Sequence, residues 1–169
     1  IFHYIDGAAD DEITYRRNTS AFDDSDLIPN VLVGVEDIDM STTVMGQKLD
    51  MPLFCSPTAL QRLFHHDGER AVARAAEKFG TMFGVSALGT VSLAEIGQMI
   101  STPKMFQFYF HKDRALNDAM IDRAKAAGFN TLALTVDTIT GGNRERDLYT
   151  GFTSPPRLSL KSLFSFATH

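Results

Sequence analysis

The 169-residue sequence has little that would indicate disulfides, zinc or a nucleic-acid partner. Its one cysteine, Cys55, allows no internal disulfide and no cysteine cluster for zinc. Lys and Arg total 16 against 21 Asp and Glu, and the net charge of −5 argues against nucleic-acid binding. No apolar run reaches the roughly 18 residues of a membrane-spanning helix. We therefore expect a globular protein of a reducing compartment, the cytoplasm by default.

Four short apolar runs predict strands that are buried on both faces. Between them lie helix candidates with apolar residues at spacings of three and four, two of which end at Gly80 and Gly128. One helix between successive strands is typical of consecutive parallel βα units. The predicted strands span residues 51–56, 81–85, 105–110 and 131–136, and the predicted helices span 67–79, 92–100 and 114–127.

Two α/β architectures accommodate this order. An open doubly wound sheet usually has a glycine-rich phosphate loop after its first strand, but residues 56–60 contain no glycine, which favours a (β/α)8 TIM barrel. A complete barrel takes roughly 250 residues, so the four βα units amount to about its amino-terminal half. Half a barrel leaves strand edges and apolar side chains uncovered. The carboxyl-terminal half is therefore expected either on a second polypeptide or on a longer version of this chain.

The sequence divides into three parts. Residues 1–50 form a preamble that caps the barrel, with a helix pair over 1–22 and short extended pieces over 27–49. Residues 51–140 carry the first four strands of the barrel. Residues 141–169 are expected to form the loop after the fourth strand and the start of a variable segment.

Candidate site residues lie at the carboxyl ends of the strands, where barrel enzymes place their active sites. Gln107 and Tyr109 are two apart on the third strand and therefore share one face, as do Thr135 and Asp137 after the fourth. A buried glutamine suits the edge of a heterocycle or a structural network. A carboxylate at Asp137 can orient a histidine, hold a cation or start an Asx turn. Ser86 either offers a hydroxyl to a ligand or serves as a turn residue.

Three further segments contain candidate binding residues. Pro57-Thr58-Ala59 forms a stiff turn that either presents backbone groups to a planar ligand or simply connects two elements. Arg144 is a candidate clamp for a carboxylate, whereas Arg146 is interpreted as part of a solvated ion pair with Glu145 or Asp147. His65 and His66 are adjacent, so their side chains are expected to point apart, and we expect no metal site.

Six segments in the same order resemble the FMN-dependent α-hydroxy-acid dehydrogenases and oxidases. This family includes L-lactate dehydrogenases, glycolate oxidase and mandelate dehydrogenase. The resemblance covers residues 1 to about 160. The segments are Phe2-His-Tyr4 with Gly7-Ala8, Asn18 to Phe22, Ser56 to Ala59, Phe106 to Tyr109, Leu134 to Asp137, and Arg144-Glu145.

The resemblance implies an FMN flavoprotein that oxidises an (S)-2-hydroxy acid to the 2-keto acid. It also implies that the catalytic histidine lies in the carboxyl-terminal half, outside this chain. Asp137 matches the carboxylate that orients this histidine, and we count Asp137 and Tyr109 as catalytic. The substrate-binding matches are Tyr4, Tyr109 and Arg144, and the flavin-binding matches are Pro57, Thr58, Ala59, Ser86, Gln107 and Thr135.

The resemblance also implies partners. The electron acceptor is a quinone, a cytochrome or oxygen, and the family is often homo-oligomeric. Leu88 occupies a position where plant glycolate oxidases carry a bulky tryptophan, which favours L-lactate over glycolate. Apolar residues in 158–166 resemble the approach to a membrane-docking segment, which would place the protein at the inner face of a membrane. Two alternatives stay open: an inactive half barrel that only assembles with its other half, and another flavin- or phosphate-binding barrel enzyme.

Overall fold

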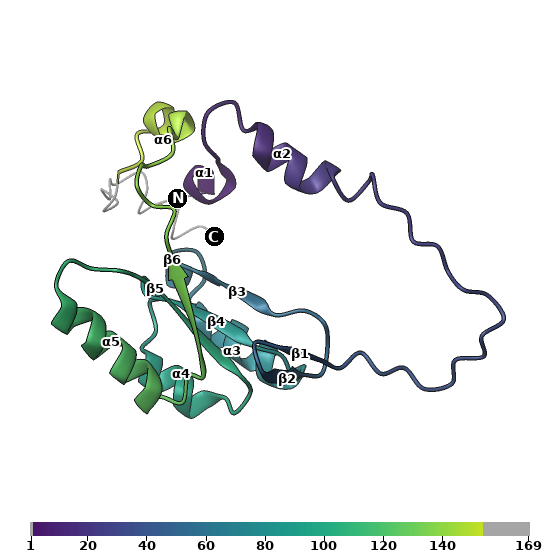
Figure 1. Cartoon of the computed structure of the whole chain (residues 1–169). Coiled ribbons are helices and arrows are strands. Elements are labelled where there is room, and N and C mark those ends of the chain that lie inside the picture. The colour runs from purple at the N-terminus through teal and green to yellow at the C-terminus, as the bar shows by residue number, and fades with distance from the viewer. Residues whose placement is uncertain (1, 154–169) are drawn as a thin grey trace. The chain divides into compact units, whose positions relative to one another are not determined.

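The computed structural model describes residues 2–153, drawn in colour in Figure 1. The chain forms two compact units. The first, here called the barrel unit, is Gly34–Ile139. The second, here called the terminal unit, joins Ile1–Val33 to Thr140–His169.

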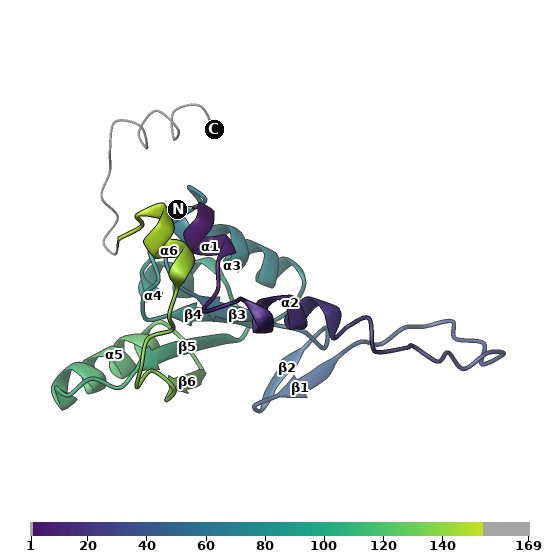
Figure 2. The same cartoon turned by 90° about the horizontal axis from the view of Figure 1, so that it is seen from above.

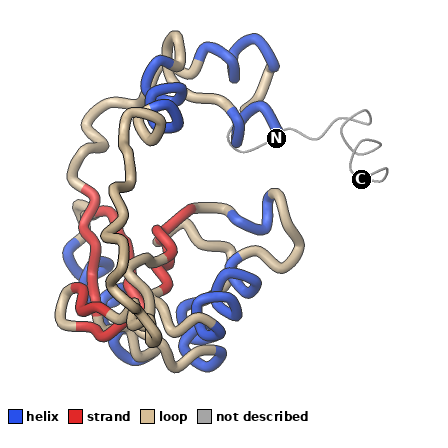
Figure 3. Tube along the Cα trace, turned by 90° about the vertical axis from the view of Figure 1, so that its right-hand side faces the viewer, coloured by secondary structure: helices blue, strands red, loops and turns tan. Residues whose placement is uncertain are grey.

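The barrel unit contains a sheet of four parallel strands in the order β3-β4-β5-β6, and a separate two-stranded antiparallel hairpin. Figure 3 shows the alternation of strands and helices along the trace. The parallel strands are β3 Cys55–Thr58, β4 Phe83–Ser86, β5 Lys104–Tyr109 and β6 Thr131–Thr135, and the hairpin strands are β1 Thr42–Val44 and β2 Gln47–Leu49. The helices are α3 Glu69–Lys78, α4 Leu93–Met99 and α5 Arg114–Ala126, with a short 3₁₀ turn η1 at Gln61–Leu63.

Local signals explain where these helices begin and end. The side chain of Ser92 accepts the backbone N–H of Glu95 at 3.2 Å and caps α4. Asp113 caps α5 by accepting the backbone N–H of Ala115 at 3.0 Å. Gly80 and Gly128 follow α3 and α5 with φ angles of 60° and 76°, a conformation that glycine adopts without a steric penalty. The predicted order of strands and helices is thus confirmed.

The apolar core lies between the sheet and its helices, which Figure 2 shows on one side of the strands. Phe106 and Phe108 of β5 pack in this core, with ring centroids 5.9 Å apart. A smaller cluster of Leu49, Met82 and Met105 lies where the hairpin joins the sheet. Because neighbours in a strand face opposite sides, Gln107 lies on the face of the sheet away from Phe106 and Phe108.

The first strand begins four residues later than predicted, at Cys55 rather than at residue 51. The register of the β3–β4 pairing shifts between Cys55 and Thr58, where Pro57 has no N–H to donate. A Cβ on Gly84 would lie 2.7 Å from Cδ of Pro57, so only glycine lets β4 approach this proline.

The outer strand β6 shows where the sheet stops. It pairs with β5, and within residues 2–153 no strand pairs with its other edge. Leu132 and Leu134 of β6 are 47% and 50% exposed. This uncovered edge is what the half-barrel prediction requires.

The terminal unit contains three short helices, α1 Phe2–Asp6, α2 Ile13–Ser20 and α6 Glu145–Thr150. The first two confirm the predicted helix pair. Helix α6 corrects the prediction of a loop after the fourth strand, because six residues of that stretch are helical. No residue of these helices is buried. The predicted apolar segment at 158–166 lies outside the described residues.

Candidate functional site

Three polar side chains on neighbouring strands form a continuous chain of hydrogen bonds in the barrel unit. Oγ of Ser86 donates to Oε1 of Gln107 at 3.0 Å, and Nε2 of Gln107 donates to Oγ1 of Thr135 at 2.7 Å. Ser86 and Gln107 are only 6% and 7% exposed. Oγ of Ser86 also accepts the backbone N–H of Leu88 at 3.1 Å, so the serine is a turn residue and a network residue at once.

This network fixes the orientation of the Gln107 amide. The amide oxygen accepts the hydroxyl of Ser86, so the amide nitrogen faces Thr135. One N–H of this nitrogen binds Thr135, and the second N–H is a further donor. The Thr135 hydroxyl accepts from Gln107, which leaves its own hydrogen to donate. The chain therefore presents N–H and O–H donors, which suit the acceptor atoms of a planar heterocycle.

The turn after β3 is connected to the turn after β4. Nε2 of Gln61 donates to Oγ1 of Thr58 at 2.7 Å, and the backbone N–H of Leu60 donates to the carbonyl of Leu88 at 3.1 Å. Pro57 and Ala59 are half-buried, and Thr58 is exposed. The predicted flavin-binding turn at 57–59 is therefore held against the loop that follows Ser86.

Glu69 is a residue that the sequence reasoning missed. Its side chain is fully buried and accepts the backbone N–H and the hydroxyl of Thr90 at 2.7 and 2.6 Å. Burial alone would raise the pKa of Glu69, but the hydrogen bonds from Thr90 and from the backbone N–H groups of Glu69 and Gln61 together hold the pKa below its usual value. Acidic residues in a first helical turn are usually solvated, so nothing in the sequence marked this one.

The remaining predicted residues of the barrel unit lie close to the ends of their strands. Tyr109 is the last residue of β5 and is 37% exposed. Asp137 is exposed and follows the end of β6 by two residues. Within residues 2–153, no hydrogen bond engages the Asp137 carboxylate.

In the terminal unit the structure brings Tyr4 and Arg144 together. The guanidinium carbon of Arg144 lies 4.9 Å from the centroid of the Tyr4 ring, and Nη2 of Arg144 donates to the carbonyl of Tyr4. Nε of Arg144 donates to Oδ2 of Asp147 at 2.7 Å. The Tyr4 ring also stacks on the ring of Phe152, with centroids 4.4 Å apart and an interplanar angle of 15°. Within the described range, Nη1 of Arg144 makes no hydrogen bond.

Two predictions about charged and histidine side chains are wrong. Arg146 does not pair with Glu145 or Asp147, since its guanidinium binds Asp6 and Glu12 at 2.7 and 2.5 Å. The rings of His65 and His66 stack at 4.6 Å instead of pointing apart. In residues 2–153 no group of three or more His, Cys, Asp or Glu is placed to hold a metal ion.

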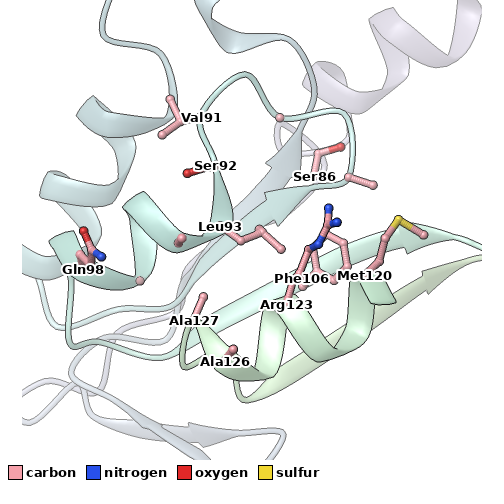
Figure 4. Close-up of a pocket in the computed structure, with 14 residues that line it drawn as sticks. Ser86, Val91, Ser92, Leu93, Gln98, Phe106, Met120, Arg123, Ala126 and Ala127 are labelled. Carbon is pink, nitrogen blue, oxygen red and sulfur yellow. The ribbon is translucent and has the colours of Figure 1, made fainter. Parts of the chain in front are cut away.

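A groove of about 620 Å³ in the barrel unit lies on the helix side between α4 and α5. Figure 4 shows Ser86 and Arg123 among its lining residues. Of the three residues in the hydrogen-bond chain, Ser86 lines this groove, and Gln107 and Thr135 do not. Among the helices that the structure describes, none is long and apolar enough to cross a membrane.

Comparison with known proteins decides the family. The family described as FMN-dependent dehydrogenase matches residues 1–169. The chain belongs to this family. It is 42% identical over 161 residues to glycolate oxidase 1 of Zea mays, and 45% identical over 165 residues to an L-lactate oxidase of Nostoc. The match confirms the resemblance to the FMN-dependent hydroxy-acid oxidases and dehydrogenases, and FMN is the cofactor of this family.

The comparisons also define how much of the barrel is present. The two alignments cover 95% of this chain but only 44% and 45% of those relatives. A solved monotopic membrane protein, (S)-mandelate dehydrogenase, superposes with a TM-score of 0.86 at 32% identity, over 96% of this chain and 43% of that one. These relatives are TIM barrels, and the chain is therefore a half barrel.

Proposed function

We propose that the complete protein oxidises an (S)-2-hydroxy acid, with L-lactate as the preferred substrate, to the 2-keto acid. The observation that carries the proposal is the pairing of Tyr4 with Arg144 in a chain that belongs to the FMN-dependent family. Oxidation of a 2-hydroxy acid removes two electrons and two protons from its carbinol group. FMN, when bound, accepts the electrons.

Arg144 is proposed to bind the substrate carboxylate. Asp147 and the Tyr4 carbonyl hold its Nε and Nη2, which orients the guanidinium, and no described residue from 2 to 153 binds Nη1. A planar guanidinium binds a carboxylate through two N–H groups, which fixes the orientation of the acid as well as its position. Tyr4 and Tyr109 would add hydroxyl donors to the same substrate.

The residues of the barrel unit fit FMN. The chain of Ser86, Gln107 and Thr135 presents donors in fixed orientations, and two of its members are almost fully buried. A heterocycle edge with carbonyl acceptors matches these donors. Pro57, Thr58 and Ala59 would contact the ring through the turn that Gln61 and Leu88 hold in place.

Asp137 is proposed to orient the catalytic histidine, which comes from the carboxyl-terminal half of the barrel. A carboxylate that accepts one ring N–H of a histidine fixes its tautomer, so the other nitrogen is free to take a proton from the substrate. The chain alone is therefore expected to be inactive. The alternative, a half barrel that only assembles with its other half, is consistent with the exposed edge of β6.

Leu88 favours L-lactate over glycolate. The side chain is 52% exposed and follows Ser86 in the loop after β4. Leucine leaves room for a methyl substituent where plant glycolate oxidases carry a tryptophan.

The electron acceptor is proposed to be oxygen, a quinone or a cytochrome. The similarity to a monotopic membrane dehydrogenase supports peripheral membrane contact. A homo-oligomer is expected.

The direct test is anaerobic reduction of the complete protein. Flavin absorbance should bleach on addition of (S)-lactate, more slowly with glycolate or (S)-mandelate, and not at all with (R)-lactate. Preference for another 2-hydroxy acid would keep the reaction and refute the choice of substrate. A flavin that no 2-hydroxy acid reduces would refute the proposed function.

A further inference from the structure

Arg146 joins two carboxylates on either side of one turn. Its Nη1 lies 2.7 Å from Oδ2 of Asp6, the last residue of α1, and its Nη2 lies 2.5 Å from Oε2 of Glu12, just before α2. A guanidinium has separate N–H groups that can bind two carboxylates at once, which an ammonium cannot do with the same geometry. Arg146 thus connects α6 to both ends of the segment between α1 and α2.

The second oxygen of each carboxylate is also engaged. Oε1 of Glu12 accepts the backbone N–H of Ala8 at 3.1 Å, and Oδ1 of Asp6 accepts the hydroxyl of Tyr15 at 3.4 Å. Asp10 and Glu12 have φ angles of 48° and 56°, a left-handed conformation that costs free energy for residues other than glycine. These contacts therefore hold a turn that would otherwise relax.

The turn that Arg146 holds also fixes the position of Tyr4. A Cβ on Gly7 would lie 3.2 Å from Cδ of Arg146 and 3.6 Å from Nη2 of Arg144, so both arginines pass close to the end of α1. Tyr4 lies within α1, and Arg144 immediately precedes α6. The connection between α1 and α6 therefore sets the distance between Tyr4 and Arg144.

We propose that Arg146 is a positioning residue that holds α1 against α6, so that Tyr4 and Arg144 bind one substrate carboxylate together. This inference rests on the proposed function, because it assigns that carboxylate to Tyr4 and Arg144. No residue of α1, α2 or α6 is buried, so apolar packing contributes little here beyond the stacking of Tyr4 on Phe152. The Arg146 and Asp6 side chains are 33% and 41% exposed, so their pairing adds little to global stability and acts locally.

The experiment compares three arginine variants in the complete protein. Arg146→Ala should raise the half-saturating concentration of the hydroxy acid about tenfold in anaerobic reduction, with flavin content unchanged. The half-saturating concentration of Arg146→Lys should lie between those of Arg146→Ala and wild type, because one ammonium replaces only part of the contacts that the guanidinium makes. The matched control is Arg17→Ala on α2, since within residues 2–153 the Arg17 side chain has no ion pair, and this variant should behave as wild type.

Calorimetric binding of pyruvate to the oxidised protein gives a readout that does not depend on turnover. The proposal predicts the same order, with Arg146→Ala weakest and Arg17→Ala equal to wild type. Unchanged affinity in Arg146→Ala, or an equal loss in Arg17→Ala, would overturn the positioning role. If Arg144→Met also left pyruvate affinity unchanged, the assignment of the carboxylate itself would fail, which distinguishes failure of the proposed function from failure of the Arg146 proposal.

Discussion

The barrel unit has a core of buried apolar side chains, whereas no residue in helices α1, α2 and α6 of the terminal unit is buried. Phe83, Val85 and Ile96 of the barrel unit have almost no exposed surface. The terminal unit relies instead on Arg144 and Arg146, whose side chains are each 33% exposed and pair with carboxylates. The proposed cofactor contacts therefore lie in the unit that has an apolar core, and the proposed carboxylate contacts of Tyr4 and Arg144 lie in the unit that depends on charge.

The largest expected effect is loss of a core aromatic ring from the barrel unit. Phe83→Ala should lower the free energy of unfolding by about 3–5 kcal/mol, because Phe83 is fully buried in the apolar core. Denaturant midpoints measured at low and high salt should fall equally, since apolar packing is not screened by ions. The control is Phe79→Ala at an exposed ring, which should cost about 1 kcal/mol or less. A loss that depends on salt would contradict the comparison.

A buried charge within the barrel unit should have the next largest effect. Glu69→Ala leaves the N–H and hydroxyl of Thr90 without their acceptor, at a cost of about 2–3 kcal/mol. Its control is Glu95→Ala, which removes a partly exposed ion pair with Arg70 and should change the denaturant midpoint less. Equal losses in the two variants would show that the Thr90 contacts do not hold the loop after β4.

The exposed carboxylate of Glu77 should stabilise the fold in a pH-dependent way. Hydrogen bonds from the backbone N–H of Thr102 and from Ser101 lower the pKa of Glu77 from 4.5 to about 2. Because the folded pKa is the lower one, its contribution to stability is complete above pH 4.5 and is lost as the pH falls towards 2. Glu77→Gln should therefore narrow the difference in denaturant midpoint between pH 7 and pH 2.

The control for this pH effect is Asp122→Asn on α5, where within residues 2–153 the carboxylate makes no hydrogen bond or ion pair. Its profile should follow that of wild type. A wild-type profile in Glu77→Gln would show that the contacts with Ser101 and Thr102 do not stabilise the fold.

The sequence predicted the sheet and its helices because periodicity and capping are local. Ser92, Asp113, Gly80 and Gly128 mark helix ends where the structure has them. The start of β3 could not be predicted in the same way, since residues 51–54 are as apolar as a strand and only the pairing with β4 shows where the ladder begins. Family membership, by contrast, followed from short segments in order.

The terminal unit shows the limit of local patterns. Helix α6 has acidic residues in its first turn and a left-handed Gly151 at its end, which are signals that a closer inspection of the sequence would have found. The partners of Arg146 lie 134 and 140 positions away in the chain, so no local pattern could separate them from Glu145 and Asp147. Burial of Glu69 is likewise a tertiary property.

The measurement that tests the account most directly is anaerobic reduction of Arg144→Met in the complete protein. Methionine removes the charge that is proposed to bind the substrate carboxylate, so the rate of flavin reduction by (S)-lactate at subsaturating concentration should fall at least about a hundredfold. The flavin should be retained, because its proposed contacts lie in the barrel unit. Yellow protein that the hydroxy acid no longer reduces is the predicted result. Reduction at the wild-type rate, or loss of the flavin itself, would contradict the assignment of the carboxylate to Arg144 and of the cofactor to the barrel unit.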